Sequence, residues 1–312
     1  MQLCRDLRSP TPHDSVVALG NFDGVHLGHA SIAARLRALA AQRGLQTTVI
    51  TFAPHPRDYF AALGRGAAVA HIASQRDRLE LLTAAGVNRV VLLRFNAALA
   101  QLSAVDFVVQ VLVNNCRARC VVVGRDVRFG HQRAGDLALL QVLGVQHGFD
   151  VVVLDDILTG AARVSSSAVR GALAAGDILT ANRLLGRAYA LSGRVIHGRK
   201  IGRTLGCPTL NVAIRLPRPA LQGIWVVRIL GLDGGVLNGV ASLGLRPTVE
   251  QTTRYSLEVH AFDWSGDAYG QRVEIVFLHK LRDEAAYVDL PTLQTAIEKD
   301  MGDARAWLAK IS

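Results

Sequence analysis

In the first half of the chain, short apolar runs alternate with longer stretches in which apolar residues recur at helical spacing. The apolar runs favour strands because they are rich in β-branched residues, and they lie at 15–19, 47–52, 89–95, 119–124 and 150–155. The stretches between them predict helices over 29–42, 75–86, 104–115 and 135–148, with Ser74 and Ser103 as N-caps. This alternation predicts a parallel sheet covered on both faces, with ligands bound at the carboxyl ends of its strands.

The second half of the chain has a different pattern. Short alternating stretches punctuated by glycine and proline lie at 223–230, 235–244, 254–262 and 271–278. Such a pattern predicts an antiparallel sheet or barrel. The chain closes with a helical pattern over 290–310. The change from alternating strands and helices to glycine-punctuated strands predicts a domain boundary near 184–192.

Composition narrows the class of protein. Half of the 312 residues are hydrophobic, but no apolar run approaches the ~20 residues of a membrane helix. The N-terminal stretch has no apolar core and is not a secretory signal, so we expect a cytoplasmic protein. The formal charge of +10 is spread over both halves without a basic run, which argues against a nucleic-acid partner. The four cysteines form no CxxC pair, which favours reduced thiols.

The stretch GNFDGVHLGH, residues 20–29, lies between the first predicted strand and helix. Two histidines three residues apart could hold a metal, bind a phosphate or simply pack. A helix start offers free backbone N–H groups and a partial positive charge, so it favours an anion. Gly28 would let a phosphate approach the backbone, while Asp23 before a glycine is interpreted as a turn former. The position therefore favours phosphate over metal.

Together with three further blocks, this stretch resembles the adenylyltransferase signature of bacterial bifunctional riboflavin kinase/FAD synthetases. The blocks are TFAPHP (51–56), VVVGRDVRFGHQRAGD (121–136), where Val127 replaces a usual aromatic residue, and SSSAVRGALAAGD (165–177). The resemblance implies an HxGH nucleotidyltransferase in which the phosphate of FMN attacks the α-phosphorus of ATP. It implies catalytic roles for His26, His29 and Arg170, ATP or phosphate binding by Gly20, Asn21, Phe22, Gly28, Ser166 and Ser167, and flavin binding by Pro54, His55, Pro56, Asp126 and Phe129.

A second group of glycines lies in SGRVIHGRKIGRTLGCPTLNV, residues 192–212. They could line a phosphate or form ordinary β-turns, and their spacing matches neither a Walker loop nor a GxGxxG loop. The stretch resembles the riboflavin kinase module, although Cys207 and Leu210 depart from the usual G-F/Y-P-T-A-N pattern. The resemblance implies ATP or phosphate binding by Gly198, Gly202, Arg203, Thr209 and Asn211, of which Thr209 and Asn211 would also bind Mg²⁺.

The resemblance continues through RYSLEVHAFDWSGDAYG, residues 254–270, and implies that Glu258 is the catalytic base for the 5′-hydroxyl of riboflavin. In an alternating strand, Leu257 and Val259 would face the core while Glu258 and His260 share the other face. A glutamate on such a face is usually only solvated. The assignment of Glu258 therefore depends on the resemblance. The same resemblance covers GLRPTVE (244–250) and KLRDEAAYVDLPTL (280–293), which would help to close the flavin pocket, and it implies flavin binding by Arg246.

We therefore predict an α/β chain with two domains. An N-terminal doubly wound parallel-sheet nucleotidyltransferase domain (1–186) would be the FMN adenylyltransferase. A six-stranded antiparallel β-barrel with a terminal helix (187–312) would be the riboflavin kinase. Small molecules would be the partners, with ATP, riboflavin and FMN as substrates and Mg²⁺ as cofactor; the chain would be a monomer or weak oligomer with no membrane partner. Two alternatives stay open: another HxGH nucleotidyltransferase, or a flavin- or nucleotide-sensing regulator.

Overall fold

The computed structural model describes residues 1–7, 10–160, 162–198, 207–232, 234–246 and 254–311. The chain folds into two compact units. The first unit consists of Met1–Val69 and Arg78–Ser165, and the second consists of Ala70–Asp77 and Ser166–Ser312.

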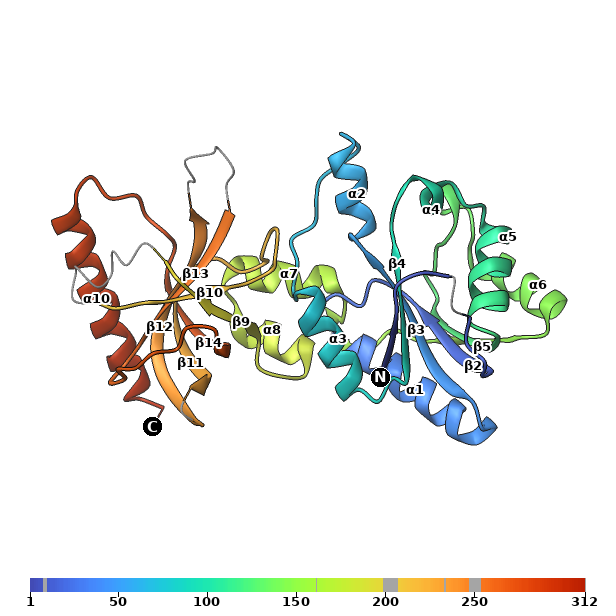
Figure 1. The fold of residues 1–312 in the computed structure, drawn as a ribbon, viewed down its shortest axis with the longest axis horizontal. Helices are drawn as coiled ribbons and strands as arrows, with labels where there is room; N and C mark the ends of the chain where they lie inside the picture. The colour runs from blue at the N-terminus through green and yellow to red at the C-terminus, as the bar shows by residue number, and fades with distance from the viewer. Residues whose placement is uncertain (8–9, 161, 199–206, 233, 247–253, 312) are drawn as a thin grey trace. The chain divides into compact units, whose positions relative to one another are not determined.

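A six-stranded parallel sheet forms the centre of the first unit (Figure 1), with the strand order β1-β4-β3-β2-β5-β6. Its strands are β1 (Gln2–Cys4), β2 (Ser15–Leu19), β3 (Gln46–Ala53), β4 (Arg89–Arg94), β5 (Ala118–Gly124) and β6 (Asp150–Leu154). Five of them match the predicted runs. The edge strand β1 was not predicted, because three residues are too few to show an alternating pattern, and it forms only by pairing with β4.

Helices cover both faces of this sheet, which confirms the doubly wound arrangement. One face packs against α1 (Leu27–Arg43) and α3 (Gln75–Ala84) through Leu36, Leu39 and Leu82. The other face is covered by α4 (Ala97–Gln101), α5 (Ala104–Phe107), the π-helix η1 (Val108–Asn115) and α6 (Leu137–His147). The unit also contains α2 (Pro56–Ala62), the 3₁₀ turn η2 (His131–Arg133) and the hairpin of β7 (Leu158–Thr159) and β8 (Ala162–Arg163). The predicted helix over 104–115 is thus a short α-helix continued by a π-helix.

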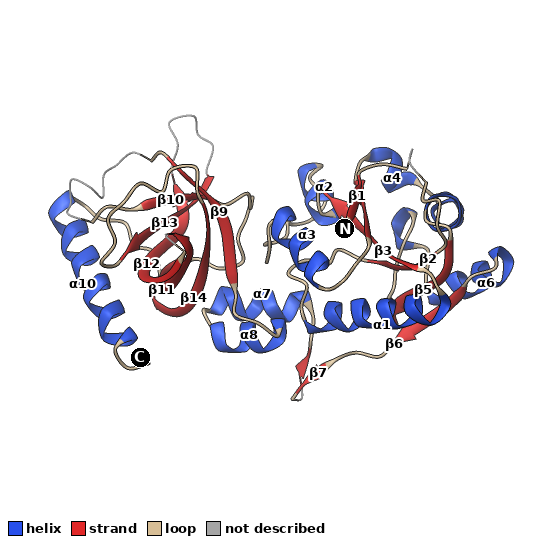
Figure 2. Cartoon of the chain, turned by 60° about the horizontal axis from the view of Figure 1, so that its bottom comes forward, coloured by secondary structure: helices blue, strands red, loops and turns tan. Residues whose placement is uncertain are grey.

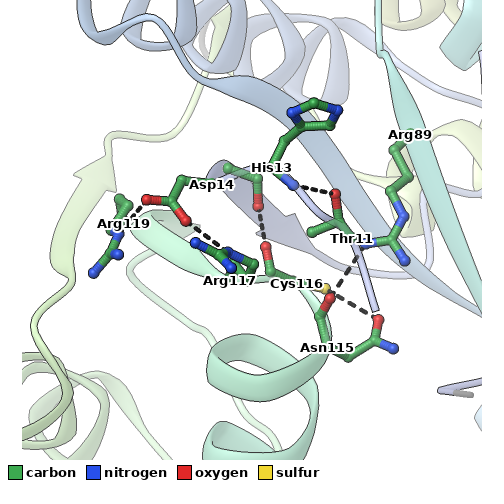
Figure 3. A network of polar contacts seen from close by, with 9 residues as sticks. Thr11, His13, Asp14, Arg89, Asn115, Cys116, Arg117 and Arg119 are labelled. Carbon is green, nitrogen blue, oxygen red and sulfur yellow. Dashed lines mark hydrogen bonds and ion pairs between the residues drawn. The ribbon is translucent and has the colours of Figure 1, made fainter. Parts of the chain in front are cut away.

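At the amino ends of the strands, polar contacts tie the start of the chain to the sheet (Figure 3). The carbonyl of Asn115 accepts hydrogen bonds from the backbone N–H of Thr11 at 3.0 Å and from Nη1 of the buried Arg89 at 3.4 Å. Hydrogen bonds from Arg119 and Arg117 hold the pKa of Asp14 below its usual value. This edge of the sheet is thus occupied by structural contacts. The predicted ligand segments that follow β2, β3 and β5 lie at the opposite, carboxyl edge.

The second unit contains the predicted closed barrel of six antiparallel strands, in the order β10-β13-β12-β11-β14-β9. Its strands are β9 (Ala190–Ile196), β10 (Leu210–Ala213), β11 (Gly223–Leu232), β12 (Gly235–Arg246), β13 (Arg254–Ala261) and β14 (Arg272–Arg282). The terminal helix α10 (Leu290–Leu308) lies alongside the barrel (Figure 2). It buries Ala304 and Leu308 in a cluster with Ile224 and Val226 of β11.

Two helices and a short distant segment complete the second unit. The helices are α7 (Ser166–Ala175) and α8 (Ile178–Leu185), and the segment is Ala70–Asp77. His71 pairs with the barrel domain, because its N–H donates to Arg218 O at 2.7 Å and its carbonyl accepts from Ala220 N at 2.9 Å. The compact unit thus includes residues before 187, while the division of activities at 186/187 stays a prediction.

A bidentate ion pair fastens α10 to the barrel. Nε and Nη2 of Arg282 donate to the carboxylate of Asp300 at 2.8 and 2.6 Å, and Asp300 is only 6% exposed. We expect Arg282→Met to destabilise the second unit by about 2–3 kcal/mol, because it leaves a buried carboxylate without its cation. All three tryptophans, Trp225, Trp264 and Trp307, lie in this unit, so their fluorescence during urea unfolding measures its stability.

A matched control for this prediction lies on the same helix. Lys299 and Asp303 form an exposed pair at 2.5 Å. Because exposed pairs contribute little, Lys299→Met should change the free energy of unfolding by less than about 0.5 kcal/mol. If Arg282→Met and Lys299→Met lowered the free energy of unfolding equally, burial of Asp300 would not be the reason that the Arg282–Asp300 pair stabilises the unit.

Candidate functional sites

The segment Gly20–His29, here called the HxGH segment, leaves the carboxyl end of β2 in a tight turn. The turn begins where Gly20 N donates to Ile50 O at 3.1 Å, and it closes where Val25 N donates to Phe22 O at 3.2 Å. Phe22 and Val25 have φ angles of 50° and 41°, in the left-handed region that costs bulky residues about 1–3 kcal/mol. The surrounding structure therefore holds this turn in a shape that the local sequence does not favour.

The two histidines of the HxGH segment stack at the start of α1. Their ring centroids are 3.8 Å apart and their planes differ by 16°. His26 is the N-cap of α1, and its Nδ1 accepts a hydrogen bond from His29 N at 3.4 Å. Because Nδ1 accepts, a neutral His26 ring would carry its proton on Nε2. A pair of imidazoles at the N-terminus of a 17-residue helix is suited to an anion.

Two neighbours fix the stacked pair in place. A side chain at Gly28 would lie 3.2 Å from the His26 ring, so the glycine permits the stack. The ring of Phe22 lies 4.8 Å from that of His29, and Phe22 is fully buried. Phe22 therefore packs beneath His29, and the ATP contact predicted for it stays a prediction.

The predicted flavin residues of the first unit lie on two segments. After the cis Ala53–Pro54 peptide, His55 caps α2 by accepting a hydrogen bond from Arg57 N at 3.1 Å, and Pro56 is the first residue of that helix. The sequence did not predict α2, which has seven residues and none of them buried. Pro54 is exposed, whereas His55 is buried.

The other flavin segment follows β5. Asp126 is exposed and pairs with Nη2 of Arg163 at 2.8 Å. Phe129 is 5% exposed and pairs with Gly135 through backbone hydrogen bonds of 3.1 and 2.9 Å. Its ring covers Gly135, where a side chain would lie 2.6 Å away. Phe129 thus packs in the core of the unit, and flavin binding by either residue stays a prediction.

The remaining predicted phosphate ligands of the adenylyltransferase lie on α7, in the second unit. Ser166 and Ser167 are its first two residues, and Arg170 follows one turn later. The half-buried Arg170 donates from Nε to Ala70 O at 2.7 Å, so its guanidinium is held by the 70–77 segment of the same unit. Their part in phosphate binding stays a prediction.

In the barrel, predicted kinase residues meet across neighbouring strands. Asn211 of β10 is paired in register with Glu258 of β13, which is paired with Ser242 of β12. Directly opposite residues of an antiparallel sheet have Cβ atoms about 5 Å apart on one face. Leu257 and Val259 are buried on the other face, as predicted. The strand register therefore places the amide of Asn211 and the carboxylate of Glu258 side by side.

The residues around this pair complete the kinase group. Gly198 lies against the Asn211 side chain, which occupies the space of a Cβ at that position. Thr209 directly precedes β10, and the nearby Pro208 carbonyl is hydrogen-bonded to the ring of His260 at 2.9 Å. Gly202 and Arg203 lie outside the described residues, as does the side chain of Arg246.

Two features near this group were not predicted. Glu284 lies over Gly244, in the space of the missing side chain, and accepts a hydrogen bond from Ser242 Oγ at 3.1 Å. Glu284 comes from the loop after β14, within the stretch 280–293 that the resemblance assigns to the flavin pocket, but its contact with β12 was not predicted. Burial raises the pKa of Cys207 to about 11, so this departure from the family pattern is a protonated, inert thiol.

Among the described residues, no group of three or more His, Cys, Asp or Glu side chains is arranged so that it could hold a metal ion. Within the same part of the chain, no helix has the length and apolar character needed to span a membrane.

Comparisons with known proteins match both halves of the chain. A family model described as FAD synthetase matches residues 8–168, and one described as riboflavin kinase matches residues 185–308. A bifunctional riboflavin kinase/FMN adenylyltransferase of Pseudomonas fluorescens is 43% identical, with 99% of this chain and 98% of the relative covered. The protein of the same name from Escherichia coli K12 is 39% identical, with 98% and 97% covered.

The fold is shared with a solved structure as well. A crystal structure described as a macrolide-efflux protein from Streptococcus pneumoniae superposes with a TM-score of 0.79 at 27% identity, and 98% of each chain is covered. The efflux activity named in that description is a statement about the Streptococcus pneumoniae protein and is not assigned to this chain. The two family models and the nearly full-length relatives show that this chain belongs to the family of bifunctional riboflavin kinases/FMN adenylyltransferases.

Proposed function

We propose that the two steps of this bifunctional enzyme are divided along the chain. Residues 1–186 would transfer AMP from ATP to FMN, which yields FAD and pyrophosphate. Residues 187–312 would transfer a phosphoryl group from ATP to riboflavin, which yields FMN. The ranges of the two family models, 8–168 and 185–308, support this order.

The observation that carries the adenylyltransferase assignment is the stacked histidine pair at the start of α1. The phosphate of FMN attacks the α-phosphorus of ATP, so negative charge must be held on the triphosphate as pyrophosphate leaves. His26 and His29, at the positive end of the α1 dipole, provide donors for that charge. Because little covalent chemistry is asked of the protein, positioning of the two substrates supplies most of the rate.

In the kinase step, Glu258 accepts the proton of the riboflavin 5′-hydroxyl as that oxygen attacks the γ-phosphorus of ATP. The hydroxyl of Thr209 and the carboxamide oxygen of Asn211 are hard oxygen donors, which fit Mg²⁺ together with substrate phosphates. Mg²⁺, when bound there, would neutralise part of the phosphate charge. The register pairing of Asn211 with Glu258 supports these assignments, because directly opposite residues lie on one face of the barrel.

Several finer properties belong to the same proposal. The enzyme would act in the cytoplasm, where ATP for both steps is available, and would work as a monomer or weak oligomer on small molecules. No nucleic-acid partner is proposed, because the positive charge is spread along the chain without a basic run.

A time course of flavin products tests the proposed activities. The protein is incubated with riboflavin, ATP and Mg²⁺, and the flavins are separated by chromatography. We expect FMN to appear first and FAD to follow from it. Another HxGH nucleotidyltransferase would leave riboflavin unchanged, and a sensor would bind flavin without turnover. Finding neither FMN nor FAD would overturn the proposal.

A further inference from the structure

A buried arginine lies beneath the HxGH segment. Arg78, on α3, is only 8% exposed. Its Nη1 donates to the carbonyl of Asn21 at 2.8 Å, and its Nη2 donates to the carbonyl of Phe52 at 3.1 Å. One planar guanidinium thus joins two backbone segments that are about thirty residues apart in sequence. Only arginine has donors in a rigid fork that can make both bonds at once.

Both carbonyls belong to segments with proposed ligand contacts. Asn21 lies in the HxGH segment, five residues before His26. Phe52 is near the end of β3, two residues before the Pro54–Pro56 segment assigned to the flavin. Thr51 strengthens the same junction, because its Oγ1 also donates to Asn21 O at 3.0 Å. The phosphate side and the flavin side of the proposed site are therefore tied together through Arg78.

The environment of Arg78 is unusual for a purely structural ion. Among the described residues, its Nε and the neighbouring Asn21 Oδ1 are buried without a hydrogen-bond partner. Burial lowers the pKa of the guanidinium, and the charge of Asp23 partly offsets that effect. A guanidinium stays charged at neutral pH in spite of such shifts. It therefore places a fixed positive charge under a turn that is assigned to phosphate.

We propose that Arg78 is a positioning residue for adenylyl transfer, which holds the phosphate-binding and flavin-binding segments in register. The inference rests on the proposed function of the HxGH segment. In-line attack requires the FMN phosphate and the α-phosphorus of ATP to meet at close range, and small misplacements are costly. A cation that bridges the two segments fixes that distance without touching either substrate.

The test compares Arg78→Lys and Arg78→Met in the full chain, with Arg35→Met as the matched control, since Arg35 is exposed on α1 of the same unit. Lysine keeps the charge but cannot donate to both carbonyls in the same fork. We expect kcat of FAD formation to fall by about tenfold in Arg78→Lys and about 100-fold in Arg78→Met. The KM values for ATP and FMN should each change by less than about fivefold, and FMN formation should stay within about twofold.

A merely structural role predicts a different result, because loss of folded protein lowers kcat only in proportion to the unfolded fraction. Circular dichroism at the assay temperature gives that fraction, and rates are expressed per folded molecule. The proposal is overturned if Arg78→Lys retains the kcat of the unmodified protein, or if the loss in both variants equals their unfolded fraction. These results concern Arg78 alone, whereas an unaffected His29→Ala variant would refute the HxGH site itself.

Discussion

Replacing His29 with alanine is expected to abolish FAD formation and to leave FMN formation from riboflavin intact. His29 stacks on His26 in the first turn of α1, where the triphosphate is proposed to bind. Removal of one preorganised donor to developing charge costs about 10²–10³ in rate. His29→Ala also removes the ring that stacks on His26, although the backbone N–H that donates to His26 Nδ1 remains. We therefore expect kcat of FAD formation to fall by about 10³-fold or more. The measurement is the rate of FAD production from added FMN and ATP.

The control for this variant is His13→Ala. His13 is an exposed histidine of the same unit that lies just before β2, at the amino edge of the sheet (Figure 3). Its removal should leave both activities within about twofold of the unmodified protein. If His29→Ala lost both activities while it remained folded, the division into two sites would be wrong.

The opposite selectivity is expected for Glu258→Ala, which should abolish FMN formation and spare FAD formation from added FMN. Loss of a general base costs about 10²–10⁴ in rate. Glu258→Gln keeps the size and the register pairing with Asn211 and Ser242 but cannot accept the proton, so it should be equally inactive. Phosphorylation of riboflavin is measured by separation of FMN from riboflavin.

A matched control lies on another strand of the same barrel. Glu274 is an exposed glutamate of β14, and Glu274→Ala should retain kinase activity within about twofold. A Glu258→Gln variant with full kinase activity would exclude Glu258 as the base. In that case Glu284, which accepts a hydrogen bond from Ser242 Oγ, would be the next carboxylate to examine.

The sequence predicted those parts of the fold that follow from local periodicity. The alternation of apolar runs and helical stretches led to the doubly wound sheet, and the glycine-punctuated stretches led to the barrel. It also located His26 and His29 at the start of a helix, because a helix boundary is visible in the residues on either side of it.

What the sequence did not reveal depends on long-range contacts. Strand β1 exists through its pairing with β4, and α2 buries none of its residues. The π-helix at Val108–Asn115 has the same apolar spacing as an α-helix over two turns, so periodicity could not distinguish them. Arg78 and Glu284 look like ordinary surface charges in a linear sequence, and only the folded chain shows what they contact.

The 70–77 segment has a consequence for how this enzyme can be divided. The chain enters the second unit at Ala70, returns to the first at Arg78, and enters the second again at Ser166. No single cut of the gene therefore separates two complete units. A fragment that starts at 187 would lack α7, α8 and His71, and the backbone groups of Arg218 and Ala220 would lose their partners. The second unit therefore depends structurally on residues from the first half of the chain. The 70–77 segment, which is encoded in that half, completes the unit that contains the barrel.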